Sequence, residues 1–163
     1  MLEAMRICNE KSKIVSFDLN LMSELWGFSE SFKETVLEAV SYSSIVFGNL
    51  HEEILLIYDG NEDTLDKHIS EKQTFICRDG HNGALGITNK DKVISNAIPI
   101  SPIDSVGAGD AFNTGFIYAS CCGKDIEESL DIGNQVAAFK LLGSGARHLS
   151  LIHISEPTRL QDI

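Results

Sequence analysis

The sequence has 163 residues, enough for one domain with a substantial core, and its 43% hydrophobic and 23% charged residues are typical of a globular chain. The formal net charge of −11 argues against nucleic acid as a partner, because phosphate backbones are bound by an excess of Lys and Arg. No run of about 18 apolar residues occurs, so we expect no membrane span and no membrane partner.

The N-terminal segment and the cysteines bear on the compartment. Residues 1–13 lack the apolar core of a secretory signal, and we therefore expect a cytoplasmic protein. The cysteines show no CxxC spacing, and two of them are adjacent, which is poor geometry for a mutual disulfide. Reduced thiols are expected at all four, which are Cys8, Cys77, Cys121 and Cys122.

The first sixty residues alternate between helical and strand patterns. We expect a helix over 2–10, a strand over 13–17, an amphipathic helix over 29–42, a strand over 44–48 and a helix over 53–58. Polar residues follow both strands, and open α/β sheets bind ligands at the carboxyl ends of their strands. The first group, Asp18 and Asn20, serves equally well to turn the chain. His51 to Leu55 lacks the second His of a zinc protease motif, so a zinc site is excluded.

The next forty residues favour short strands. After a polar surface helix over 62–70, strands are expected over 74–77, 84–88 and 93–98, as an antiparallel meander. The turn between the first two contains Gly80 and Gly83, and Asn82-Gly83 is by itself a hairpin signal. The whole pattern predicts an α/β fold, with a mostly parallel sheet flanked by helices and a small antiparallel element at 74–98.

A helix N-terminus is predicted where the stretch Asp104-Ser-Val-Gly-Ala-Gly-Asp-Ala-Phe112 leads into apolar residues at helical spacing. Small residues expose main-chain N–H groups there, and the positive end of the helix dipole attracts an anion such as phosphate. Asp110 would repel that anion, so it suggests a base that takes a proton from an attacking hydroxyl. The alternative is that Asp110 only stabilises the first helical turn.

A last helix is expected over 126–142, with Leu130, Ala137 and Leu141 on one stripe. Asn134 lies in its middle, and the segment Gly143-Ser-Gly-Ala146 follows it. A lone Asn and a glycine-rich helix end are both common for structural reasons alone.

Residues 104–112 resemble the signature D-T-x-G-A-G-D-x-F of the ribokinase-like (PfkB-type) carbohydrate kinases, with Ser105 in place of the usual Thr. The resemblance implies that Asp110 is the catalytic base. It also implies that the amides of Gly107, Ala108 and Gly109 form the anion hole for the transferred phosphoryl group. Asp104 would organise the cation environment, which makes it a metal-site residue.

Two shorter stretches resemble motifs of the same family. Asp18-x-Asn20-x-Met22-x-x-Leu25-Trp26 is similar to D-x-N-x-R-x-x-L-W, with Met22 where Arg is common. Asn49-x-x-Glu52 matches an N-x-x-E motif associated with Mg²⁺ and phosphate. The first resemblance leans toward fructokinases and 2-keto-3-deoxygluconate kinases.

The resemblance also implies a nucleotide pocket. Gly80 and Gly83 keep the spacing of a turn that helps to form it, and Asn134 matches an Asn near the adenine. Gly143 to Ala146, with Gly145 as the expected contact, resembles the loop that closes over the nucleotide. That loop also helps to hold the ion in members that depend on a monovalent cation. The implied cofactors are ATP, Mg²⁺ and, in such members, K⁺.

The resemblance covers residues 2–147, and we interpret 1–147 as the C-terminal half of a ribokinase-like kinase domain, which makes the fold a partial one. Residues 148–163 do not resemble the family and look like a translated sequencing adapter, so we interpret them as a foreign tail. Because the other half contributes the lid and most sugar contacts, we expect this chain to be inactive alone. The full-length protein is expected to form a homodimer.

The leading hypothesis is an ATP-dependent phosphotransferase acting on a hydroxyl of a small-molecule sugar or sugar acid. A dinucleotide-dependent oxidoreductase is an alternative, because Gly107-x-Gly109 resembles the start of a Rossmann fingerprint, although Phe112 replaces the third Gly. A fragment that binds nucleotide without catalysis is the other alternative.

Overall fold

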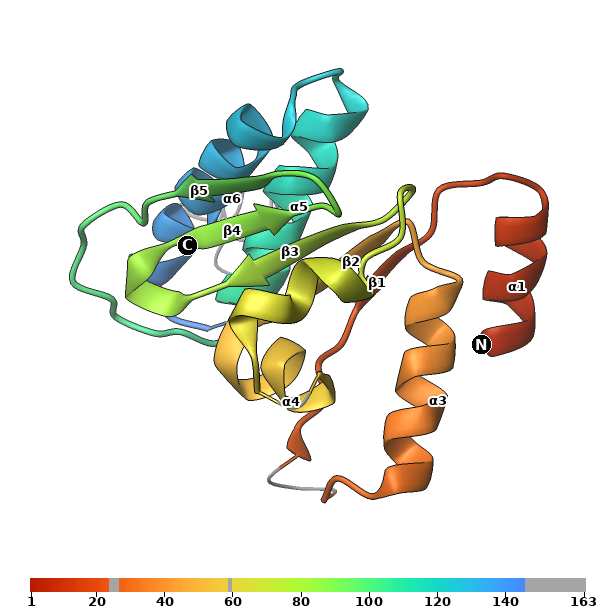
Figure 1. Ribbon diagram of the computed structural model, residues 1–163. Helices are drawn as coiled ribbons and strands as arrows, with labels where there is room; N and C mark the ends of the chain where they lie inside the picture. The colour runs from red at the N-terminus through yellow and green to blue at the C-terminus, as the bar shows by residue number, and fades with distance from the viewer. Residues whose placement is uncertain (24–26, 59, 146–163) are drawn as a thin grey trace, which may run out of the picture. The chain divides into compact units, whose positions relative to one another are not determined.

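The computed structural model describes residues 1–23, 27–58 and 60–145, and it divides into two compact units, one from Met1 to Ile94 and one from Ser95 onward (Figure 1). The expected foreign tail over 148–163 lies outside the described residues, and so do Leu25, Trp26 and Ala146. Among the described helices, none combines the length and apolar character that crossing a bilayer requires.

The first unit alternates helices and strands in chain order. Its elements are α1 (Leu2–Glu10), β1 (Ser16–Asp18), α3 (Glu30–Ser41), β2 (Ile45–Asn49), a π-helical turn η1 (Leu50–Ile54), α4 (Leu55–Ile57), a 3₁₀ helix η2 (Glu62–His68), β3 (Thr74–Arg78), a 3₁₀ turn η3 (Gly80–Asn82), β4 (Ala84–Ile87) and β5 (Lys92–Ser95), whose last residue is the first of the second unit.

The five strands form one sheet in the order β1-β2-β3-β4-β5 (Figure 1). β1 pairs with β2 and β2 with β3 in parallel, whereas β3 and β4 are antiparallel. The expected α/β class, with a parallel sheet and a small antiparallel element, is therefore confirmed. The carboxyl ends of β1, β2 and β3 meet at one edge, which positions Asp18, Asn49 and Arg78 there.

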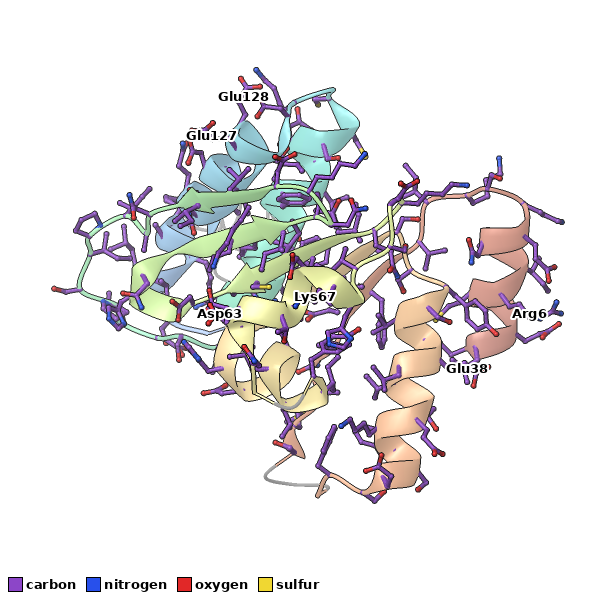
Figure 2. All side chains as sticks on the ribbon, viewed as in Figure 1. Arg6, Glu38, Asp63, Lys67, Glu127 and Glu128 are labelled. Atoms are coloured by element: carbon purple, nitrogen blue, oxygen red, sulfur yellow. The ribbon has the colours of Figure 1, made fainter. Side chains whose placement is uncertain are left out.

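Helices cover one face of this sheet. Val46, Phe75 and Cys77 point to that face, where they pack in one apolar cluster with residues of α3, η1, α4 and η2. Side chains alternate across a strand, so Phe47 and Ile76 lie on the opposite face, and both are also buried. α1 lies against α3. Charged side chains such as Arg6 on α1 and Glu38 on α3 extend away from the ribbon (Figure 2).

Several boundaries differ from the expected ones. The first strand covers 16–18 rather than 13–17, because Ile14 is exposed and regular pairing starts beyond Val15. The expected helix over 53–58 starts earlier, at Leu50, because the Asn49 side chain caps it. The segment after Asn61 is 3₁₀, and the last strand ends at Ser95 instead of residue 98.

The second unit contains a pair of packed helices, α5 (Ala108–Cys121) and α6 (Ile126–Leu141). Glycines let them approach closely: a Cβ on Gly115 would lie 3.0 Å from the carbonyl oxygen of Ile132, and one on Gly133 would lie 2.9 Å from the Phe112 ring. On α6, Leu130 is buried as expected, but Ala138 rather than Ala137 continues the buried stripe. Glu127 and Glu128 on the first turn of α6 point away from the pair (Figure 2).

Candidate active site

The turn that precedes α5 is held by the carboxylate of Asp104. Its Oδ1 accepts a hydrogen bond of 3.0 Å from the amide of Val106, and its Oδ2 accepts one of 2.7 Å from the amide of Gly145. These amide hydrogen bonds, Val106 first and then Gly145, lower the pKa of Asp104, and the nearby charge of Lys140 acts in the same direction. Asp104 therefore joins the turn before α5 to the loop after α6. The first segment belongs to the signature at 104–112, and the second is the loop that starts at Gly143.

Gly107 starts α5 in a left-handed conformation, with φ of 81°, which a residue with a Cβ adopts only at a cost. Its carbonyl oxygen accepts from the amide of Ala111 at 3.0 Å, and the amide of Ala108 donates to the oxygen of Ser105 at 3.1 Å. Within the described part of the chain, the amides of Gly107, Gly109 and Asp110 have no acceptor. Such amides at a helix N-terminus can bind an anion.

Asp110 lies in the first turn of α5 with its side chain exposed. The next residues of the helix, Phe112, Phe116 and Ala119, are buried as the apolar spacing predicted, and they anchor the helix. The buried face of α5 thus fixes the main chain of Asp110 in the same helical turn as the open amides, while its carboxylate remains accessible to a ligand. A carboxylate in that place can accept a proton from a hydroxyl group that is held there.

Lys140 is a residue of this region that the sequence pattern missed. It lies on the last turn of α6 with 0% of its surface exposed. Its Nζ donates to the main-chain oxygen of Asp104 at 3.0 Å and to that of Gly143 at 3.4 Å. Its only sequence signal is its position seven residues after the buried Gly133, two helical turns along the same face.

Asn134 is buried on α6 and ties that helix to the end of β5. Its Nδ2 donates to the hydroxyl of Ser95 at 2.8 Å, to the carbonyl oxygen of Ser95 at 3.2 Å and to that of Asn96 at 3.3 Å. The same hydroxyl donates to Asp131 at 2.6 Å. The side-chain nitrogen of Asn134 therefore has a structural role in this protein.

In the first unit, Asn49 is the last residue of β2 and Glu52 lies in η1, so both are at the end of the strand as the sequence predicted. The Asn49 Oδ1 accepts from the amides of His51 and Glu52, at 3.0 and 2.9 Å, and so caps η1. The Glu52 side chain is exposed. The inward carboxylate is that of Glu53, whose Oε2 accepts from the Asn49 amide at 2.6 Å and whose Oε1 accepts from the Leu21 amide at 2.7 Å.

The π-helical turn explains why Glu53 takes this position. In an α-helix the side chain three residues after the cap reaches back to the amide of the cap, and here that residue is Glu52. Because a π-turn holds one residue more, the fourth residue reaches it instead. A sequence signal existed: Glu53 shares the helical face of Leu50, Ile54 and Ile57, which are all buried.

Glu53 belongs to a small charged cluster at the same edge of the sheet. Arg78, at the end of β3, makes two hydrogen bonds to Asp18 and has its Nη2 3.6 Å from Glu53. All three side chains are largely buried, between 12% and 26% exposed. Asn20 adopts a left-handed conformation, with φ of 39°, so this residue also turns the chain.

Gly80 and Gly83 lie in the loop that joins β3 to β4. The loop runs over five residues, Asp79 to Gly83, because Arg78 pairs with Ala84, so the expected hairpin is present with a longer turn than Asn82-Gly83 alone suggests. Both glycines have positive φ, of 55° and 106°, which favours glycine.

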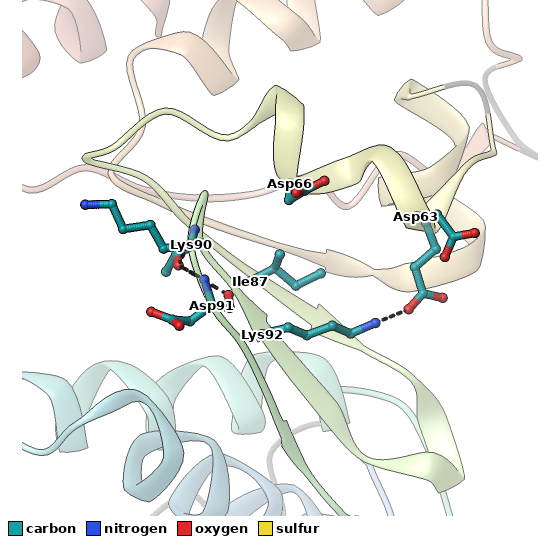
Figure 3. A pocket seen from close by; sticks show the side chains of 8 residues that line it. Asp63, Asp66, Ile87, Lys90, Asp91 and Lys92 are labelled. Atoms are coloured by element: carbon teal, nitrogen blue, oxygen red, sulfur yellow. Dashed lines mark hydrogen bonds and ion pairs between the residues drawn. The ribbon is translucent and has the colours of Figure 1, made fainter.

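A separate shallow cavity of about 240 Å³ lies between η2 and the β4–β5 strands (Figure 3). Its lining is mostly charged, and Lys92 forms an ion pair with Glu62 at its rim. None of the site residues predicted from the sequence lines it. Its eight lining residues are Glu62, Asp63, Asp66, Ile87, Thr88, Lys90, Asp91 and Lys92.

The described residues contain no group of three or more His, Cys, Asp or Glu side chains arranged to hold a metal ion.

The pfkB family carbohydrate kinase model matches residues 1–153. The chain belongs to the pfkB family of carbohydrate kinases. The signature at 104–112 and the sheet topology described above are consistent with this membership.

Individual relatives agree. The chain is 30% identical to ribokinase from Bacillus subtilis over 68% of this chain and 37% of the relative. It is 26% identical to 2-dehydro-3-deoxygluconokinase from Haemophilus influenzae over 90% of this chain and 48% of the relative. A double mutant of fructokinase from Vibrio cholerae, crystallised with fructose, ADP and a potassium ion, superimposes with a TM-score of 0.79 at 26% identity, over 90% of this chain and 50% of that one. The chain thus spans about half the length of these relatives or less.

Proposed function

We propose that this chain supplies the phosphoryl-transfer half of an ATP-dependent kinase that phosphorylates a hydroxyl group of a sugar or sugar acid. The observation that carries the proposal is the start of α5, where the exposed Asp110 shares the first helical turn with main-chain amides that have no acceptor in the described chain. Family membership supports it, because the relatives named above are kinases of sugars and sugar acids.

Residues of the second unit have separate roles in the proposed phosphoryl transfer. The amides of Gly107, Gly109 and Asp110, at the positive end of α5, stabilise negative charge on the oxygens of the transferred phosphoryl group. Asp110 takes the proton of the attacking hydroxyl. Asp104 holds the loop at Gly145 against the turn, which fixes the place of these amides.

The residues of the first unit handle the nucleotide and its metal ion. Glu52, with an exposed carboxylate, is the proposed contact to a nucleotide-bound Mg²⁺, and Asn49 orients it by capping the same turn. The ion, when bound, neutralises charge on the phosphates. Gly80 and Gly83 are proposed to border the nucleotide, since a turn with no side chains at these two points lets a ligand approach the main chain.

The substrate is proposed to be a pentose, a ketohexose or a keto-deoxy sugar acid, as the named relatives suggest. A dinucleotide oxidoreductase is disfavoured by Phe112. This residue stands where a Rossmann fingerprint has its third glycine, and its ring is buried against Gly133.

The test is sugar-dependent release of ADP, measured on a chimera in which this chain replaces the matching half of the Vibrio cholerae fructokinase. We expect ATP turnover that requires a ketohexose, a pentose or a keto-deoxy sugar acid. ATP hydrolysis at the same rate without any sugar would contradict the proposal, as would NAD(P)-dependent oxidation of the same sugars.

A further inference from the structure

The buried lysine of α6 makes contacts that are typical of a bound cation. Lys140 has no exposed surface, and its ammonium group donates to two main-chain carbonyl oxygens, those of Asp104 and Gly143. Carbonyl oxygens that converge on one point are also the ligands that proteins use for K⁺. A buried ammonium is costly unless such groups replace its water.

This ammonium lies between the two segments to which the resemblance assigned a monovalent cation. The resemblance assigned the ion to Asp104 and to the loop that starts at Gly143. These are the segments that Lys140 joins. The Asp104 carboxylate also joins them, because it accepts a hydrogen bond from the Gly145 amide. A K⁺ ion would have to share these carbonyl oxygens with a fixed positive charge, and like charges only a few ångströms apart repel strongly in a poorly solvated place.

We propose that the Lys140 ammonium replaces the monovalent cation of this site, so that the turn at Asp104 and the α5 N-terminus are held in place without K⁺. Lys140 is a positioning residue: it contacts no reacting atom and acts through Asp104, whose turn leads directly to Gly107. The inference rests on the family resemblance for the place of the ion, and not on the proposed phosphoryl transfer.

The primary test measures thermal unfolding of the ligand-free 163-residue chain in KCl and in choline chloride of equal ionic strength, because choline is too large for the site. We expect wild type to unfold at the same temperature in both salts. Lys140→Met, which keeps the length of the side chain and removes its charge, should unfold roughly 5 °C or more below wild type in choline chloride. KCl or NH₄Cl should restore much of this loss with saturable dependence on concentration.

The matched control is Lys124→Met. Lys124 is an exposed lysine of the same unit, paired with Glu128 at 2.8 Å, and its replacement should change neither the unfolding temperature nor its dependence on KCl. A Lys140→Met variant that responds equally to KCl and choline chloride would overturn the proposal.

Wild type alone provides a second readout, in case Lys140→Met does not fold. Thallous ion substitutes for K⁺ and its NMR signal broadens on binding, so we expect no saturable broadening with wild type. Saturable binding of thallous ion by wild type would overturn the proposal. Both measurements are made without nucleotide, so their results do not depend on kinase activity. A failure of the proposed kinase function would show only in the ADP-release assay.

Discussion

Arg78 makes two hydrogen bonds to the carboxylate of Asp18, of 3.1 Å from Nη1 to Oδ2 and of 2.8 Å from Nη2 to Oδ1. Because β2 lies between β1 and β3, this pair spans the carboxyl edge of the parallel part of the sheet. The guanidinium fork suits a carboxylate with two parallel hydrogen bonds, and Glu53 adds a second negative charge.

Arg78→Met should lower the free energy of unfolding by about 1–3 kcal/mol, because it leaves the largely buried carboxylates of Asp18 and Glu53 without their cation. Urea denaturation measures the change. Arg6→Met is the matched control, since the ion pairs of Arg6 on α1 are exposed to solvent and should contribute little to stability. Equal losses for the two variants would show that the Asp18–Arg78 pair does not stabilise the sheet edge.

Glu53→Ala should destabilise the protein by about 1–3 kcal/mol, because the amides of Leu21 and Asn49 both lose their acceptor. Glu52→Ala, one residue away, should cost less than about 0.5 kcal/mol, because that side chain is exposed. The two unfolding curves compare an inward with an outward carboxylate on the same turn. A reversed order would contradict the π-helical register of η1.

Gly115→Ala tests the contact between α5 and α6. An alanine usually stabilises a helix by roughly 1 kcal/mol relative to glycine. Here its Cβ would lie 3.0 Å from the carbonyl oxygen of Ile132. That oxygen belongs to the main chain of α6, so it cannot move aside as a flexible side chain could. We expect a net loss of about 1–3 kcal/mol by urea denaturation. Ser120→Ala, at an exposed position of the same helix, should be neutral or stabilising, and a stabilising Gly115→Ala would argue against the close packing.

The lowered pKa of Asp104 predicts a specific dependence of stability on pH. Its folded pKa lies below the ordinary value of about 3.9, because the amides of Val106 and Gly145 donate to the ionised carboxylate. Its contribution is therefore complete above that ordinary value and is lost as the pH falls through the folded pKa. Asp104→Asn should lose less stability than wild type between about pH 6 and about pH 2. Asp63→Asn, at an exposed carboxylate, should follow wild type, and an Asp104→Asn curve parallel to wild type would contradict the assignment.

The sequence predicted the elements better than their internal geometry. The apolar spacing of α3 and the glycine signature before α5 are local features, and local features determine where a helix begins. The 74–98 meander was also recognised, because turn residues separate its short apolar runs.

The two charged residues that the sequence analysis missed, Glu53 and Lys140, lie on buried helical faces, but periodicity does not encode which groups they contact there. Glu53 turns inward because η1 contains an additional residue, and Asn49-x-x-Glu52 gives no sign of that. Lys140 is buried because two carbonyl oxygens converge on it from segments 36 and 3 residues away. Only the folded chain brings these donors and acceptors together.

The most direct test of the central claim is the Asp110→Asn variant in the fructokinase chimera. The amide keeps the size of the side chain and the start of α5 but cannot take a proton, so kcat should fall by roughly 10²–10⁴-fold while the affinity for ATP stays nearly unchanged. Thr114→Val, on the next turn of α5, is the control, since its hydroxyl only donates to the main-chain oxygen of Asp110. A kcat for Asp110→Asn within a few-fold of wild type would contradict the assignment of Asp110 as the base in phosphoryl transfer.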